Sequence, residues 1–474
     1  MSAKTHENPF QEAFFRQKSR AVTLRAEPLS ARKKRLRDLE TWLHANRERI
    51  EKAVHADYRK PILEVDTSEI YPVLAELRHA LRHLNEWAAP LKIDAPLSYL
   101  GSRSEVRYEP KGVCLIMAPW NFPFNLTIGP LISCLTAGNT AFVKPSEMTP
   151  HTSALVREMV SEVFEPDVVA VFEGGIEVSQ ALLDLPFDHI FFTGSTTVGR
   201  LVMQAAAKHM SSITLELGGK SPTVVDKTAR LEDSARRIAF GKFLNNGQTC
   251  IAPDYILVEA SVKDRFLELL KKEINRIFGD GKGINEHSSS YSRLATPKQF
   301  QRITALVDDA VSKGAQADAL GPRQEQERFM APVILTQVPA HARIWEEEIF
   351  GPVLPVETFT DTDAVVARIN KGPKPLALYV FSQDRRFQEL VLQHTSSGSA
   401  CINDCVLQFT HPNLPFGGVN HSGMGKSHGR YGFVAFSNEK SVLRQKNGLA
   451  GPYLLYPPYT KAMKKIVDAL LKWF

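Results

Sequence analysis

Between residues 9 and 90, hydrophobic positions recur every three or four residues among many charged ones. The spacing is clear from Tyr71 through Leu77 to Leu84. Such a spacing places the apolar side chains on one face of a helix. Runs that would suit a strand are almost absent from this segment. The pattern therefore predicts a layer of helices whose apolar face packs against a sheet.

The pattern changes near Asp94, and extended chain is predicted over Leu97–Tyr108. From there to Val225, short and continuously apolar runs alternate with helical stretches. Apolar runs of this kind indicate strands buried on both faces of a parallel sheet. The strands predicted in this first α/β unit are Val113–Ala118, Thr140–Lys144, Val168–Phe172, His189–Thr193 and Thr223–Val225.

The same alternation returns between Leu231 and about Ala400 and predicts a second α/β unit. Its predicted helices and strands are Ser234–Leu244, Val262–Phe278, Lys298–Lys313, Tyr255–Val258, Val353–Thr358 and Ala377–Phe381. A glycine-rich segment and a separate amphipathic helix follow. The predicted fold class is therefore α/β, with two doubly wound domains.

Composition narrows the functional classes. The chain of 474 residues is 43% hydrophobic and 23% charged, as soluble globular proteins are. The net charge of +6 is scattered, and the basic run Arg32–Arg35 suits a solvated helix face, so no nucleic-acid partner is expected. Five cysteines is an odd and low number, which excludes a disulfide framework. Charges at Lys4, Glu7 and Glu12 argue against a signal peptide, no apolar run is long enough to span a membrane, and a cytoplasmic location is expected.

Cys250 is the first candidate for chemistry. It follows Asn246-Gly247-Gln248-Thr249, in a predicted loop between a helix and a strand. Small and polar neighbours leave its backbone accessible, whereas the other four cysteines lie in or beside apolar runs. A nucleophilic cysteine needs an environment that favours its thiolate. On these residues alone, the alternative of an inert, buried cysteine stays open.

Two further segments carry polar groups suited to catalysis. Glu216 stands between two leucines before Gly218-Gly219, where burial would raise its pKa and favour a proton acceptor. A structural carboxylate is the alternative. Asn121 directly follows a predicted strand, at the sheet edge where α/β proteins bind ligands, and its amide can donate to a developing oxyanion.

These segments together resemble the aldehyde dehydrogenase superfamily. The blocks that carry the resemblance are PWNFP (119–123), KPSE (144–147), FTGSTTVG (192–199), LELGGK (215–220), NNGQTC (245–250), EEIFGPV (347–353) and PFGG (415–418). The sequences CIAPDY (250–255) and SHGRYGF near the end are similar to the class-three branch, which acts on fatty or aromatic aldehydes. The resemblance covers residues 9–446.

The resemblance implies a role for each matching residue. Cys250 corresponds to the nucleophile, Glu216 to the general base for hydrolysis, and Asn121 to the oxyanion donor. The residues that correspond to cofactor-binding positions are Trp120, Lys144, Glu147, Gly194, Ser195, Gly199, Glu348 and Phe350. The implied cofactor is NAD, with NADP possible, because a carboxylate at Glu147 would repel a 2′-phosphate.

The resemblance also implies a domain plan. Residues 1–88 and 110–217 would form the NAD(P)-binding domain and 218–402 the catalytic domain. Residues 89–109 and 403–446 would form a bridging arm for a homodimer, and 447–474 a tail. Two alternatives are a relative that passes the acyl group to phosphate or coenzyme A, and a non-enzymatic protein on this fold.

Three local features need separate interpretation. Asn420-His421 departs from the glycine common in relatives, which predicts a reshaped loop, with His421 on the surface. No metal site is expected, because a strand from Cys401 to Cys405 would span about 13 Å, although a turn there would remove that argument. The tail helix, with apolar residues from Met463 to Phe474, is expected to dock on its own chain or a partner subunit rather than on a membrane.

Overall fold

The computed structural model describes residues 8–96, 99, 101–447 and 456–473. The predictions that concern Lys4, Glu7, Leu97 and Phe474 lie outside these residues. The helical layer predicted for the N-terminal segment is confirmed. Its elements are α1 (Gln11–Ala26), α2 (Leu29–Ala45), α3 (Arg47–Tyr58), α4 (Ile62–Val65), the π-helix η1 (Asp66–Ile70) and α5 (Tyr71–Trp87).

The first sheet has six strands in the order β17-β7-β6-β3-β4-β5, all parallel to their neighbours except β17. Its strands are β3 (Val113–Met117), β4 (Thr140–Lys144), β5 (Val169–Val171), β6 (His189–Gly194), β7 (Ser212–Leu217) and β17 (Gly423–Met424). Its connecting helices are α6 (Asn125–Ala137), α7 (Pro150–Val163), α8 (Ile176–Leu183) and α9 (Thr196–His209).

Strand β3 explains why the apolar runs are continuous. Cys114 and Ile116 belong to the core on the side of α2, α5, α6 and α7. Val113, Leu115 and Met117 belong to a second core that includes Phe14 of α1. Successive side chains of a strand point to opposite faces, so a strand covered on both faces needs apolar residues at every position.

The second sheet has seven strands in the order β10-β13-β14-β9-β8-β15-β16, and only β10 is antiparallel to its neighbour. Its strands are β8 (Pro222–Val225), β9 (Tyr255–Glu259), β10 (Gln316–Ala319), β13 (Val333–Thr336), β14 (Val353–Phe359), β15 (Ala377–Phe381) and β16 (Ser399–Ile402). The accompanying helices are α10 (Leu231–Phe243), α11 (Lys263–Phe278), α12 (Pro297–Ser312), α13 (Thr362–Asn370) and α14 (Arg385–His394). Short elements complete this part of the chain: η3 (Leu244–Gly247), β11 (Arg323–Gln324), β12 (Phe329–Met330), η4 (Arg343–Trp345) and η5 (Leu407–Thr410). The predicted α/β class with two mainly parallel sheets is confirmed.

Two details of the predicted α/β units are corrected. The strand at Thr223–Val225, grouped by sequence with the first unit, pairs with β9 and β15 in the second sheet. Strand β7 was not predicted, because Ser212-Ile213-Thr214 interrupts the apolar run that marked the other strands. Its first two residues are only half-buried, and the edge strand β17 pairs with its other end, at Leu215 and Glu216.

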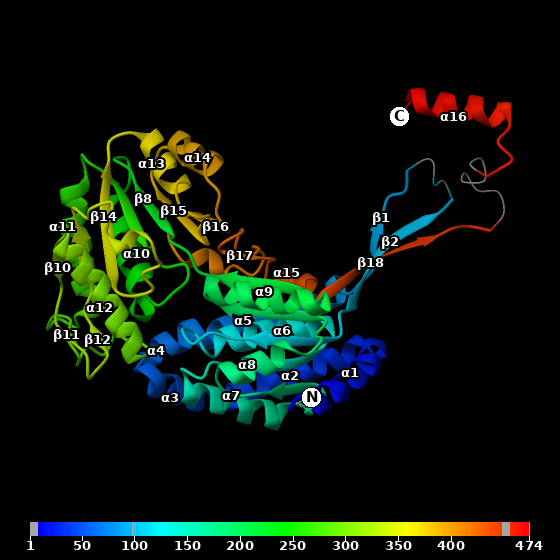
Figure 1. Cartoon of the computed structure of the whole chain (residues 1–474), viewed down its shortest axis with the longest axis horizontal. Helices are drawn as coiled ribbons and strands as arrows, with labels where there is room; N and C mark the ends of the chain where they lie inside the picture. The colour runs from blue at the N-terminus through cyan, green and yellow to red at the C-terminus, as the bar shows by residue number, and fades with distance from the viewer. Residues whose placement is uncertain (1–7, 97–98, 100, 448–455, 474) are drawn as a thin grey trace, which may run out of the picture.

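A third sheet projects from the body as an arm (Figure 1). It joins β1 (Leu91–Ile93), β2 (Arg103–Pro110) and β18 (Ser437–Arg444), and α15 (Gly429–Ala435) leads into it. The tail forms α16 (Lys461–Trp473), which lies apart from the body in Figure 1.

The expected docking of α16 on its own chain is corrected, since Leu470 and Leu471 are 46% and 74% exposed. Of the surfaces considered for the apolar face of α16, a partner subunit and a membrane surface are left. Among the described helices, none has the length and apolar character needed to cross a membrane.

The packing of Phe142 in β4 gives a test of the first core. Its side chain is fully buried, and its ring lies 4.6 Å from Phe172 and 5.2 Å from Phe187, measured between ring centroids. Replacing it with alanine leaves a cavity, so Phe142→Ala is expected to lower the free energy of unfolding by about 3–5 kcal/mol. Urea denaturation followed by circular dichroism measures the free energy of unfolding of the variant and the wild type. The control Val22→Ala, at a position 69% exposed, should stay near the wild type; a loss as small as the control's for Phe142→Ala would contradict the proposed packing.

Candidate active site

A cleft of about 500 Å³ opens at the carboxyl ends of β3, β6 and β7, and the segments around Cys250 and Glu348 form its other side. The position is the one at which parallel α/β sheets bind ligands. The cleft brings together eight of the residues predicted from sequence: Trp120, Asn121, Gly194, Ser195, Glu216, Cys250, Glu348 and Phe350. Lys144, Glu147 and Gly199 are not among the described residues that line it.

The loop before Cys250 has an unusual backbone. Asn245, Asn246 and Gly247 all have left-handed conformations, with φ of 53°, 56° and 72°. A side chain at Gly247 would place its Cβ atom 2.3 Å from the carbonyl oxygen of Gly351. Left-handed asparagines are strained relative to glycine, so this turn persists only because its surroundings hold it. The turn ends in Cys250, between η3 and β9, as the sequence predicted.

Hydrogen bonds join this loop to the turn that carries Asn121. The amide Nδ2 of Asn121 donates to the carbonyl oxygen of Gln248 at 3.0 Å. In return, Nδ2 of Asn245 donates to the backbone carbonyl oxygen of Asn121 at 2.7 Å. Gln248 is itself fixed, because Nε2 donates to the carbonyl oxygen of Arg293 and Oε1 accepts from the N–H of Ala295. The side-chain amide of Asn121 retains a second N–H, and Asn121 and Cys250 both line the cleft.

Glu216 occupies the boundary between two cavities. It lines the cleft and also a second, largely apolar cavity that includes Tyr71 and Leu126. The hydroxyl of Ser427 donates to its carboxylate. Burial raises the pKa of Glu216 above its usual value, while the neighbouring His428 and the Ser427 hydrogen bond oppose the rise. A buried carboxylate with a raised pKa is suited to accept a proton near neutral pH.

The electrostatic environment of Cys250 differs from the expectation. Burial raises the pKa of its thiol well above the usual value, and the carboxylates of Glu348 and Glu216 raise it further. The resting cleft therefore keeps the thiol protonated rather than favouring its thiolate. Burial and the nearby Asp254 raise the pKa of Glu348 to about 8, so that this carboxyl group is itself largely protonated at neutral pH.

The cleft offers a built surface for an extended anionic cofactor. Ser195 caps the N-terminus of α9, where residues 194–197 face the cleft and present free backbone N–H groups. The carboxylate of Glu348 lies so close to Gly218 that a Cβ atom there would be 1.9 Å from it. Trp120 and Phe350 meet edge to face, with centroids 5.3 Å apart. These features fit a dinucleotide.

The remaining predicted cofactor residues lie outside the cleft lining. Lys144 ends β4 at the same sheet edge, and its Nζ atom lies 2.7 Å from the carboxylate of Glu147. Lys144 is buried whereas 44% of the Glu147 side chain is exposed. Gly199 packs in the first turn of α9 against Leu217, where a Cβ atom would lie 2.7 Å from the leucine side chain. Gly199 therefore allows α9 to pack closely against Leu217 of β7, and it does not line the cleft.

Other expectations from sequence have clear outcomes. Asn420 adopts the left-handed conformation with φ of 57°, so asparagine supplies a conformation that glycine would otherwise provide. His421 is exposed, as predicted. Strand β16 ends at Ile402, so the strand-length argument against a metal at Cys401 and Cys405 is wrong. Within the described ranges, no group of three potential ligands is placed to hold a metal ion.

Sequence reasoning missed several residues that complete the site. Arg302 lines the cleft, and its guanidinium donates to the carboxylate of Glu347 and to the carbonyl oxygens of Glu348 and Ile349. Ser427 holds Glu216 from a segment about two hundred residues away. No local pattern marks Arg302, because an arginine on an amphipathic helix is common in any soluble protein. Ser427 begins the SHGRYGF segment that carries part of the resemblance, but sequence reasoning assigned it no role at Glu216.

Comparison with known proteins agrees with this geometry. The profile described as "Aldehyde dehydrogenase family" matches residues 3–442. The putative aldehyde dehydrogenase AldX of Bacillus subtilis is 44% identical over 435 residues, covering 92% of this chain and 97% of that protein. The 4,4′-diaponeurosporen-aldehyde dehydrogenase of Staphylococcus aureus is 39% identical over 469 residues, covering 98% of this chain and all of that protein. The dimeric NADP-preferring aldehyde dehydrogenase of Mus musculus is 38% identical, covering 97% of this chain and 98% of that protein.

Solved structures show the same fold. The substrate-bound state of Staphylococcus aureus AldH has a TM-score of 0.93 and 38% identity, covering 98% of this chain and all of that one. An NADP-dependent enzyme of E. coli has a TM-score of 0.84 and 26% identity, covering 92% of this chain and 90% of that one.

The coupling between Glu348 and Cys250 can be tested without cofactor or substrate. Glu348→Gln removes a carboxylate that raises the thiol pKa, so alkylation of Cys250 by iodoacetamide should become about three- to tenfold faster at about pH 9, where Glu348 is ionised. At about pH 6.5, where Glu348 is already protonated, the variant and the wild type should react alike. Peptide mass spectrometry measures the rate at Cys250.

Glu346→Gln is the matched control for this measurement, because Glu346 also lines the cleft and is not among the groups that shift the Cys250 thiol. An equal acceleration in both variants would contradict a specific interaction between Glu348 and Cys250.

Proposed function

The chain belongs to the aldehyde dehydrogenase family, and we propose that it oxidises medium- or long-chain aliphatic or aromatic aldehydes to carboxylic acids through a thioester on Cys250. The observation that carries this proposal is the meeting of a thiol, an amide donor and a buried carboxylate in one cleft. Those three groups supply the nucleophile, the oxyanion donor and the base of an acyl transfer followed by hydrolysis.

The first step forms a bond between the sulfur of Cys250 and the aldehyde carbon. As this bond forms, the thiol proton passes to the carboxylate of Glu216, which releases it to solvent before the hydrolysis step, and the electron pair of the carbonyl moves onto oxygen. The free N–H of Asn121 and the backbone N–H of Cys250 donate to that oxyanion. When bound, a nicotinamide cofactor would be held by residues 194–197, Glu348 and Phe350, and it would supply the hydride acceptor for oxidation of this adduct to a thioester.

The second step is hydrolysis of the thioester. Glu216 takes a proton from a water molecule, whose oxygen adds to the thioester carbon, and the carbon–sulfur bond then breaks to release the acid. The carboxylate must be ionised for this role, so the rate of hydrolysis should fall as the pH falls through the raised pKa of Glu216. Glu216 and Cys250 line the same cleft, which is where this water molecule would add.

The second cavity supports the substrate class. Apolar side chains that include Tyr71, Leu126 and Phe409 line it, and it leads to Glu216. The charged pair in its wall, His428 and Glu76, is mutually compensated, with 3.7 Å between the nitrogen and the oxygen. The apolar lining favours an apolar group next to the aldehyde carbon, and the cavity volume of about 40 Å³ sets no chain length.

NAD is the proposed cofactor, with NADP as a second substrate. The basis is the exposed carboxylate of Glu147, paired with Lys144, at the sheet edge where the resemblance locates the adenosine ribose. A carboxylate there accepts from ribose hydroxyls and repels a 2′-phosphate. A homodimer in the cytoplasm is also proposed, supported by the relative named as dimeric, which matches nearly the whole chain.

The test of the proposed reaction follows NADH and NADPH formation with aldehydes from acetaldehyde to hexadecanal, and with benzaldehyde. Turnover should depend on Cys250 and be lost in Cys250→Ala. Glu216→Gln should slow the first burst of NADH and lower steady turnover by about 10²–10⁴-fold, since both steps use this base. Product that forms as acyl-coenzyme A or acyl phosphate, and only with the added acceptor, would overturn hydrolysis as the second step.

Cofactor choice gives a second test. Glu147→Gln removes the negative charge while keeping a hydrogen-bonding side chain. The ratio of kcat/KM for NADP to that for NAD is expected to rise by about tenfold, the value of one removed unfavourable charge contact. An unchanged ratio would contradict the assignment of Glu147 to the ribose site. Glu173→Gln, at a half-buried carboxylate paired with Arg157, is the matched control.

A further inference from the structure

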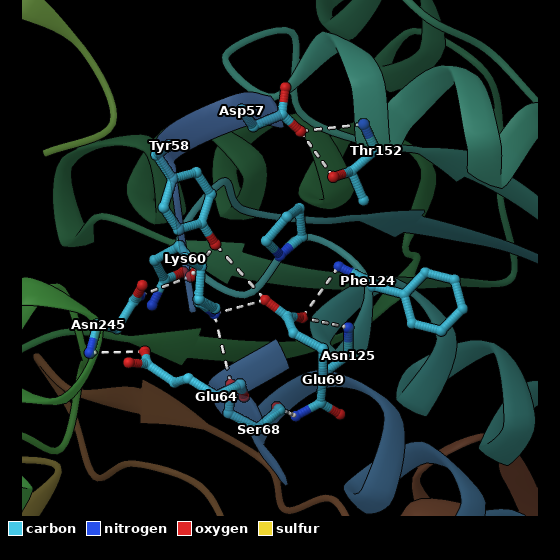
Figure 2. Close-up of polar contacts among 12 residues, drawn as sticks. Asp57, Tyr58, Lys60, Glu64, Ser68, Glu69, Phe124, Asn125, Thr152 and Asn245 are labelled. Carbon is cyan, nitrogen blue, oxygen red and sulfur yellow. Dashed lines mark hydrogen bonds and ion pairs between the residues drawn. The ribbon is translucent and has the colours of Figure 1, made fainter. Parts of the chain in front are cut away.

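A buried polar cluster lies behind Asn121 and takes no direct part in the proposed chemistry. It consists of Tyr58, which ends α3, of Lys60 in the following loop, and of Glu69 in η1 (Figure 2). Each of these three residues is at most 1% exposed. None of the three belongs to the described lining of the cleft or of the apolar cavity. All three come from the N-terminal helical layer, far in sequence from both Asn121 and Cys250.

The ion pair at the centre of the cluster fixes the start of α6. Nζ of Lys60 lies 2.7 Å from Oε1 of Glu69. The other oxygen of Glu69 accepts from the backbone N–H groups of Phe124 and Asn125, at 3.2 and 2.9 Å. Helix α6 has no side-chain cap of its own, so Glu69 satisfies donors that would otherwise be left free. Lys60 balances the charge of this buried carboxylate.

Tyr58 connects the cluster to Asn121. Its hydroxyl donates to the backbone carbonyl oxygen of Asn121 at 2.9 Å and lies 3.5 Å from Oε1 of Glu69. The same carbonyl accepts from Nδ2 of Asn245, on the loop that ends in Cys250. Glu64, four residues beyond Lys60, accepts the backbone N–H of Asn245 at 2.8 Å. The N-terminal helical layer therefore binds to both segments of this junction, the turn that carries Asn121 and the loop that ends in Cys250.

We propose that Tyr58, supported by the Lys60–Glu69 pair, is a positioning residue that sets Asn121 relative to Cys250; the proposal rests on the function proposed above. An oxyanion donor acts only when its nitrogen lies about 2.7–3.1 Å from the developing oxyanion. A misplacement of about 1 Å costs on the order of a hundredfold in rate. Tyr58 acts at the backbone of Asn121, and so leaves the amide free to meet the substrate.

The first experiment compares Tyr58→Phe with Tyr291→Phe. Tyr291 is an equally buried tyrosine whose hydroxyl has no hydrogen-bond partner among the described residues. Tyr58→Phe should lower the rate constant of the NADH burst by about tenfold, as the loss of one buried hydrogen bond allows. KM for NAD and the midpoint of thermal unfolding should stay near the wild type, and Tyr291→Phe should match the wild type throughout. A lowered melting temperature with an unchanged burst would show a purely structural role and overturn the proposal.

A double-mutant cycle with Asn121→Ala tests whether Tyr58 acts through Asn121. In the Asn121→Ala background, the added Tyr58→Phe change should lower the burst rate by less than about twofold, because the group that it positions is gone. Effects that multiply independently would overturn the proposal.

Hydrogen–deuterium exchange separates this proposal from the proposed function. In the unliganded protein, Tyr58→Phe should speed amide exchange in residues 119–125 and 245–250 relative to the wild type and Tyr291→Phe. Unchanged exchange in both segments would overturn the positioning role. A wild type that oxidises no aldehyde would instead overturn the proposed function, and the exchange result would still decide the role of Tyr58.

Discussion

The site depends on the hydrogen bonds that join the Asn121 turn to the loop before Cys250. The first segment follows a strand of the six-stranded sheet, and the second precedes a strand of the seven-stranded sheet. Nothing in either sheet alone sets the distance between the amide and the thiol. The reciprocal bonds between Asn121, Asn245 and Gln248 do so, and they also hold the strained left-handed turn that presents Cys250. The two sheets are thereby joined through one hydrogen-bonded junction.

Burial shifts the pKa values of the acidic groups of this site in the same direction. It raises the pKa of Glu216, of Glu348 and of the Cys250 thiol, because the charged form of each is poorly solvated in the cleft. Adjacent carboxylates add to the effect at the thiol. This environment favours the protonated form of the Cys250 thiol. It also gives Glu216 a basicity that a solvated carboxylate would lack.

The sequence predicted which residues meet in the cleft better than it predicted the framework that holds them. Cys250, Glu216 and Asn121 stand out because each lies in a short segment with glycine or proline neighbours, and the apolar strands stand out because they are buried on both faces. Strand β7 was missed because its polar residues, such as Ser212 and Thr214, interrupt that pattern. Tyr58, Lys60 and Glu69 were missed because a charged, helical segment predicts a solvated surface. Their burial follows only from tertiary packing against α6.

The buried Lys60–Glu69 pair has an energetic cost, and its hydrogen bonds show what the pair contributes in return. Removing two charges from water is expensive, and apolar side chains of similar volume would often stabilise a core as well. An apolar pair, however, could not accept the hydrogen bonds from the backbone N–H groups that begin α6, nor the one from the hydroxyl of Tyr58. These bonds have direction, whereas apolar packing tolerates small displacements. Under the proposed function, in which Asn121 is the oxyanion donor, its placement therefore gains more from a buried ion pair than from additional apolar contact area.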